Sequence, residues 1–283
     1  MATVVQRSAI GLCLIAVFVG LLLIDDKSGH GYGVIALVGL LVAGALREYT
    51  LMLRELAQVS GLLLPAGVAF VVVRGLAYEL DPRWGLAQAV VAIGFAYAVF
   101  FFALRGAPSV ERFRALTATA FGFCYIPFLA GYALDVRFYG EQVGAAGFLY
   151  LIAISKGTDI CAFFSGKAFG RTKLVPSVSP GKTTAGFVGA VAGGALITSA
   201  FAAWSPVGNL LPLALAPGAG ALLALVVISG DLIESFIKRS VDVKDSAKLL
   251  PGFGGVLDIV DSVMIAAPVV YGLFFLLSVR ATS

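Results

Sequence analysis

Nine apolar runs fill most of this chain, and they constrain its fold more than any other feature. Of its 283 residues, 60% are hydrophobic and only 13% are charged, whereas an ordinary soluble domain is roughly 25% charged. A helix that crosses a bilayer needs roughly 20 mainly apolar residues, with about 17 as the usual lower limit. The composition therefore predicts an all-α, polytopic integral membrane protein with about nine transmembrane helices.

The runs differ in length. The second and third are short, so these two either include polar flanks or are partly re-entrant. The sixth is expected to continue through Lys156 and Asp159 to Phe164. The predicted spans are Ala9–Ile24, Tyr32–Leu46, Gly61–Val73, Gly85–Leu104, Ala115–Leu134, Val143–Ile154, Ala185–Ala203, Leu210–Ile228 and Val256–Val279.

The distribution of basic residues predicts an orientation. With the N-terminus inside, 15 of the 20 lysines and arginines fall in inner segments and 5 in outer segments. Cytoplasmic loops collect such residues, so we expect the N-terminus inside and the C-terminus outside, in the inner membrane if the source is bacterial. The net charge of +4 resides in short loops, which indicates contact with anionic lipid headgroups and not with nucleic acid.

Charged residues gather in one stretch, 229–262. If Ala221–Arg239 is one helix, Asp231, Ser235 and Lys238 follow one another at i, i+4 and i+7 and form a single stripe. Glu234 falls off that stripe, as does Arg239. Charges beside apolar helices are costly and are usually paired or functional. This stripe is therefore the first candidate for chemistry.

A second group of acids follows a glycine-rich turn. Asp258 and Asp261 are spaced i and i+3 at the start of the last apolar run, so they share a helix face. Together with Asp231 they could converge where two helices face each other, with Asp245 in reserve. The glycines at 252, 254 and 255 would let the backbone approach a ligand closely, or would simply form an interhelical turn.

The loop between the sixth and seventh runs offers a phosphate site. Gly181-Lys182-Thr183 is not a P-loop, because Pro176 stands where a glycine is required and apolar spans flank the segment. Its cations, hydroxyls and glycines could still cradle an anion, or could form a solvated basic loop. Asp159 lies one helical turn from Lys156 and is either its structural partner or part of a site.

These two segments resemble phosphatidate cytidylyltransferases, also called CDP-diacylglycerol synthases. The upstream match is Asp159-x-x-Ala162, Gly166-x3-Gly170-Arg171 and Ser179-Pro180-x-Lys182-Thr183 to Gly186. The chain departs from the family pattern at Phe253, where histidine is usual, and at Ile259, where arginine is usual. The downstream match is Ser235-x-x-Lys238-Arg239-x4-Lys244-Asp245-x-Ala247-x3-Pro251-x-Phe253-Gly254-Gly255-x-x-Asp258-x-x-Asp261.

The resemblance implies a reaction and a set of roles. The family joins CTP to phosphatidate in the membrane and forms CDP-diacylglycerol and pyrophosphate with Mg²⁺, and it suggests a homodimer. We expect one cytidylyltransferase-like domain over 1–283, with N-terminal spans in 1–142, a catalytic half in 143–283 and the active site at the cytosolic face. The identity of any second, monovalent cation stays open. The expected metal ligands are Asp231, Asp258 and Asp261, the expected catalytic residues are Lys238, Arg239, Lys244 and Asp245, and the expected substrate-binding residues are Asp159, Ser179, Lys182, Thr183, Ser235, Gly254 and Gly255.

Other functions remain open. A CTP-dependent lipid kinase would share the nucleotide, the metal and a lipid acceptor, but would transfer the terminal phosphate to a hydroxyl group. An ion or anion transporter could also place Asp159, Asp231 and Asp258 among its spans. Charge gathered at one membrane face, without paired broken helices in two halves, argues against transport. The departures at Phe253 and Ile259 also allow a paralogue with a shifted substrate or reduced activity.

Overall fold

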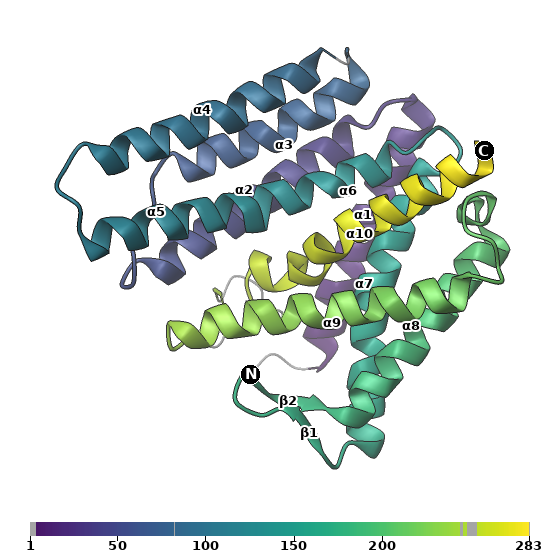
Figure 1. Ribbon diagram of the computed structural model, residues 1–283. Helices are drawn as coiled ribbons and strands as arrows, with labels where there is room; N and C mark the ends of the chain where they lie inside the picture. The colour runs from purple at the N-terminus through teal and green to yellow at the C-terminus, as the bar shows by residue number, and fades with distance from the viewer. Residues whose placement is uncertain (1–3, 82, 244–245, 248–253, 283) are drawn as a thin grey trace. The chain divides into compact units, whose positions relative to one another are not determined.

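The computed structural model describes residues 4–81, 83–243, 246–247 and 254–282 (Figure 1). Two residues of the expected site, Lys244 and Asp245, lie outside these ranges, as do Gly252 of the glycine-rich turn and Phe253 of the downstream match. The chain is built almost entirely of helices, which confirms the all-α class. The α-helices are α1 (Val4–Ser28), α2 (Tyr32–Leu53), α3 (Leu63–Glu79), α4 (Trp84–Leu104), α5 (Val110–Phe123), α6 (Leu129–Arg137), α7 (Gly144–Phe169), α8 (Thr184–Trp204), α9 (Ala216–Ser240) and α10 (Val256–Thr282).

Every predicted span overlaps a helix, although Leu210–Ile228 begins before α9, which starts at Ala216. Among the described residues, seven helical segments are long and apolar enough to cross a membrane, which fits a polytopic membrane protein. One of them, Val110–Arg137, joins α5 and α6 through a π-helical turn, Cys124–Phe128. Pro127 lies in this turn and has no N–H to donate, which favours such an interruption. The helix α3 has 17 residues, so the exact number of spans stays a prediction.

The chain forms two compact units, and each is described by itself. The first comprises 1–134 and 241–260. In it α2 packs against α3, and α3 packs against α4. A buried aromatic group of Phe70, Phe95 and Phe123 joins α3, α4 and α5, with ring centroids 5.2 Å and 4.6 Å apart. This packing forms the apolar core of the N-terminal helices.

The second unit comprises 135–240 and 261–283. Its helices α7, α8 and α9 pack closely, and glycines permit the contact. A Cβ atom on Gly194 of α8 or Gly220 of α9 would collide with the backbone of the other helix. A buried hydrogen bond between the hydroxyls of Tyr150 and Thr198 (2.8 Å) also joins α7 to α8. These contacts fix α7 and α9, two helices that carry charged residues selected from the sequence, among them Asp159, Asp231 and Lys238.

A short β-hairpin connects α7 to α8. Its antiparallel strands are β1 (Lys173–Val175) and β2 (Ser179–Thr183), and Lys173 pairs with Thr183. The sequence predicts only a loop here, because strands of three and five residues, the second containing Pro180 and Gly181, carry no hydrophobic alternation. The Thr183 hydroxyl accepts a hydrogen bond from the Gly186 N–H (3.1 Å) and caps α8. The hairpin therefore ends in a fixed position at the start of α8.

Candidate active site

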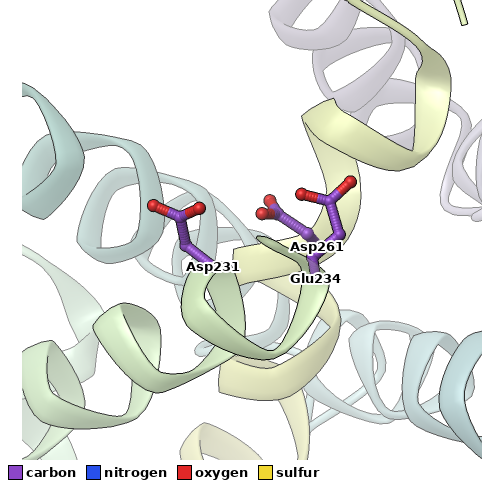
Figure 2. Close-up of side chains that lie close together, drawn as sticks. All are labelled: Asp231, Glu234 and Asp261. Carbon is purple, nitrogen blue, oxygen red and sulfur yellow. The ribbon is translucent and has the colours of Figure 1, made fainter. Parts of the chain in front are cut away.

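Three carboxylates converge in the second unit. Asp231 and Glu234 extend from α9 and Asp261 from α10, and one oxygen of each lies within 4.8 Å of the others. Figure 2 shows the three side chains converging from the two helices. Glu234 and Asp261 are buried and Asp231 is partly exposed. We call these three residues the acidic cluster; carboxylates this close require nearby cations to remain charged together.

Glu234 was not expected in this cluster. The predicted stripe follows Asp231, Ser235 and Lys238, but a helix also places residue i+3 only about 60° around its axis from residue i. Glu234 therefore faces the same side as Asp231. The signal available in the sequence was its i, i+4 spacing to Lys238, with the acid on the N-terminal side, which is the favourable orientation for such a pair.

Two lysines each make one short ion pair with the cluster. The Lys238 Nζ lies 2.7 Å from Glu234 Oε2, and both side chains are buried. The Lys182 Nζ extends from β2 to Asp231 Oδ2 (2.9 Å) and also donates to the Ile228 carbonyl (3.3 Å). The hairpin thus brings a predicted substrate-binding cation to a predicted metal ligand.

A third lysine lies between two acids. The Lys156 Nζ is 3.9 Å from Asp159 Oδ2 and 3.8 Å from Asp261 Oδ1. It donates a hydrogen bond to the Ser262 hydroxyl (2.9 Å), and that hydroxyl also donates to Asp159 Oδ2 (3.4 Å). The pairing of Lys156 with Asp159, one of the two roles open for Asp159, is present, but Asp261 shares the lysine. Asp159 is therefore connected to the acidic cluster through Lys156 and Ser262.

The structure thus brings together six of the residues selected from the sequence. Ser235 belongs to this group because its hydroxyl lies 3.5 Å from Asp231 Oδ1. Lys156, Glu234 and Ser262 are the additions that the geometry makes. The selected residues that meet here are Asp159, Lys182, Asp231, Ser235, Lys238 and Asp261.

Asp258 has other partners, within the first unit. Its Oδ2 accepts hydrogen bonds from the N–H of Gly255 (2.7 Å) and from the N–H and hydroxyl of Ser246 (3.1 Å and 2.8 Å). Gly254 has φ +84°, and a Cβ there would collide with the Asp258 carboxylate. Here the glycines serve the turn that begins α10.

Glu48 of α2, which the sequence did not single out, is buried and binds the same turn. Its Oε1 accepts from the Val256 N–H (2.8 Å), and its Oε2 accepts from the Leu257 N–H (2.9 Å). The Ser246 hydroxyl lies 2.8 Å from both Glu48 Oε2 and Asp258 Oδ2, so the two carboxylates share its single proton. A carboxylate at a helix N-terminus is favourable, because the free N–H groups there carry partial positive charge. The signal in the sequence was an acid two residues after an apolar run that ends at Leu46.

The remaining predicted residues have separate places. Ser179 pairs with Val175 in the hairpin, Thr183 caps α8, and Arg239 is exposed at the end of α9. The roles expected for these three residues stay predictions.

Comparison with known proteins shows one family over nearly the whole chain. A family model described as the cytidylyltransferase family matches residues 5–277. Proteins named phosphatidate cytidylyltransferase are similar in Brucella suis, with 46% identity over 136 residues (46% of this chain and 47% of that protein), and in Bacillus subtilis, with 37% over 171 residues (59% of each). The one from Mycobacterium leprae is 33% identical over 182 residues, 62% of this chain and 54% of that protein. The chain spans about half the length of the curated relatives it matches.

Proposed function

The chain belongs to the cytidylyltransferase family, and on this basis we propose that it transfers CMP from CTP to phosphatidate, giving CDP-diacylglycerol and pyrophosphate for phospholipid synthesis. The observation that carries the proposal is the acidic cluster with its lysines: three carboxylates within 4.8 Å and cations on either side. Joining two anionic substrates requires positive charge that offsets their repulsion, which lysines and a metal ion held by carboxylates can supply; it does not require a strong base.

The donor set of the acidic cluster suits Mg²⁺. Its ligands would be hard carboxylate oxygens, and Mg²⁺ usually takes one or two carboxylates together with water and substrate phosphate. We propose Asp231 and Asp261 as ligands, with Glu234 in the third position for which the sequence offered Asp258. When bound, Mg²⁺ would offset the negative charge of the phosphates.

The transfer itself exchanges one bond for another. An oxygen of the phosphatidate phosphate attacks the α-phosphorus of CTP, the bond from that phosphorus to the β-phosphate oxygen breaks, and pyrophosphate leaves with the electron pair. A phosphate monoester is largely ionised near neutral pH, so no strong base is needed. Lys182 can bind a nucleotide phosphate, because its side chain is 20% exposed. Its hairpin connects two candidate spans, which places it at the ends of helices where a water-soluble nucleotide has access.

Orientation and assembly are part of the same proposal. The site would face the cytosol, where CTP is found, with the N-terminus inside and the C-terminus outside, as the basic loops indicate. Family resemblance supports a homodimer. Lys238 and Arg239 stay candidate phosphate contacts.

The test uses purified protein in phosphatidate vesicles with CTP labelled either in cytosine or in the γ-phosphate. Cytosine label in the lipid, dependent on Mg²⁺ and abolished by a chelator, is the expected result. Lipid labelled only from the γ-phosphate would replace the transferase with a lipid kinase. Ion movement across the vesicles without a nucleotide-linked lipid would indicate a transporter.

A further inference from the structure

Lys156 differs from the other two lysines in how it contacts the acids. Lys238 and Lys182 each approach one carboxylate to 2.7 Å and 2.9 Å. Lys156 remains 3.8 Å and 3.9 Å from two carboxylates, beyond hydrogen-bond distance, and donates instead to the Ser262 hydroxyl (2.9 Å). Its ammonium group is therefore shared between two acids without being bound tightly to either.

The exposure of these side chains gives the ammonium group access to a ligand. The Lys156 and Asp159 side chains are 35% and 38% exposed, whereas the Asp261 side chain is 6% exposed. Lys238, at 11%, is mostly enclosed. Lys156 thus lies between a buried carboxylate of the acidic cluster and the accessible side of α7.

The charge of the site changes sign when a divalent cation binds. In their ionised forms the four carboxylates of Asp159 and the acidic cluster, with the three lysines, carry one net negative charge. A divalent cation converts this to one net positive charge. It would also repel an ammonium group 3.8 Å from Asp261. A divalent cation in the acidic cluster would therefore weaken the attraction of Lys156 to Asp261 and favour binding of an anion.

We propose that Lys156 is a catalytic residue that binds the phosphate of the lipid substrate. Without substrate its ammonium group balances Asp159 and Asp261; with a divalent cation in the acidic cluster it turns to a phosphate oxygen of the lipid. The nucleotide is assigned to Lys182, which approaches the cluster at Asp231 from a hairpin between spans, whereas Lys156 approaches it at Asp261 from within a span. This inference rests on the proposed function.

The first experiment measures the kinetics of Lys156→Met and Lys156→Arg in mixed micelles of varied phosphatidate content. Loss of one charge-assisted contact should lower kcat/KM for phosphatidate by about 10- to 100-fold in Lys156→Met. The KM for CTP should be unchanged, and Lys156→Arg should retain most of the activity. Lys167→Met is the matched control, because Lys167 is exposed on the same helix and should behave as the wild type.

The second experiment needs no turnover. Mn²⁺ is titrated into substrate-free protein, and free Mn²⁺ is followed by electron paramagnetic resonance. Removing a competing positive charge should tighten Mn²⁺ binding in Lys156→Met by about tenfold. A lysine that merely supported the fold would leave binding unchanged or weaken it.

The outcomes separate the two proposals. Three results would overturn the role of Lys156 and leave the proposed function standing. They are wild-type kinetics in Lys156→Met, a rise in the KM for CTP without a fall in kcat/KM for phosphatidate, and Mn²⁺ binding that does not tighten. No CDP-lipid from either the wild type or Lys167→Met would overturn the proposed function itself. Elution volume and thermal unfolding of each variant identify a misfolded protein, and Lys156→Gln, which also removes the charge, replaces Lys156→Met if that variant misfolds.

Discussion

Replacing Lys238 with methionine should lower the stability of the fold, because this substitution removes the positive charge beside the buried Glu234 carboxylate. The ammonium and carboxylate lie 2.7 Å apart, with side chains 11% and 2% exposed. At an effective dielectric constant of about 20, two unit charges at this 2.7 Å separation attract each other by about 6 kcal/mol. Desolvation offsets part of that, so we expect a loss of about 3–5 kcal/mol in the free energy of unfolding.

A double-mutant cycle tests this reasoning. Lys238→Met, Glu234→Gln and the double variant are unfolded reversibly in mixed micelles, and the free energies are compared. The double variant should lie within about 1 kcal/mol of the wild type, since a buried pair replaced by uncharged groups of similar size is often neutral. If Lys238→Met kept full stability but lost activity, the lysine would act on substrate, as the sequence predicts, and not as the partner of Glu234.

Two further substitutions separate the acids of the site from those that hold the turn. Asp261→Asn should reduce turnover by at least about 100-fold, with folding and membrane insertion intact. Asp242→Asn, at an exposed side chain, is the control. Wild-type rates in Asp261→Asn would remove Asp261 from the site. Glu48→Gln should lower the free energy of unfolding by about 1–3 kcal/mol through weaker bonds to Ser246 and the start of α10. Glu55→Gln, at a side chain 87% exposed, should not change it, and equal stabilities of the two variants would contradict the capping role of Glu48.

Hydropathy located the helices because lipid leaves few alternatives for an apolar run. It placed the end of the second run at Leu46, whereas α2 continues to Leu53. The extension contains Glu48, which binds the start of α10, and Tyr49, whose hydroxyl donates to the Ala118 carbonyl (2.8 Å). A polar residue with a hydrogen-bond partner inside the protein can lie in a buried helix. A hydropathy scale scores each residue by its sequence neighbours, so it cannot detect a partner that is distant in sequence.

The spacing of residues along each helix predicted much of the candidate site. A helix fixes which of its residues share a face, so Asp231, Ser235 and Lys238 could be grouped from the sequence, as could Lys156 with Asp159. What spacing could not show is how separate elements meet. The contact of Lys182 with Asp231 depends on a hairpin, and the sharing of Lys156 with Asp261 depends on the packing of α7 beside α10.

The two acids at the start of α10, Asp258 and Asp261, differ in how many backbone N–H groups they bind, and this difference affects which carboxylate is available to a ligand. The first four N–H groups of a helix have no partner within it. Glu48 accepts from Val256 and Leu257, and Asp258, within the first turn, accepts from Gly255 just before it. Asp261 lies beyond that turn. Its Oδ1 accepts a hydrogen bond from the adjacent Ser262 N–H (2.5 Å), and its carboxylate also lies within 4.8 Å of those of Asp231 and Glu234. In α10, therefore, the outer acid of the i, i+3 pair accepts hydrogen bonds at the helix start, and the inner acid, Asp261, is the one to test as a ligand.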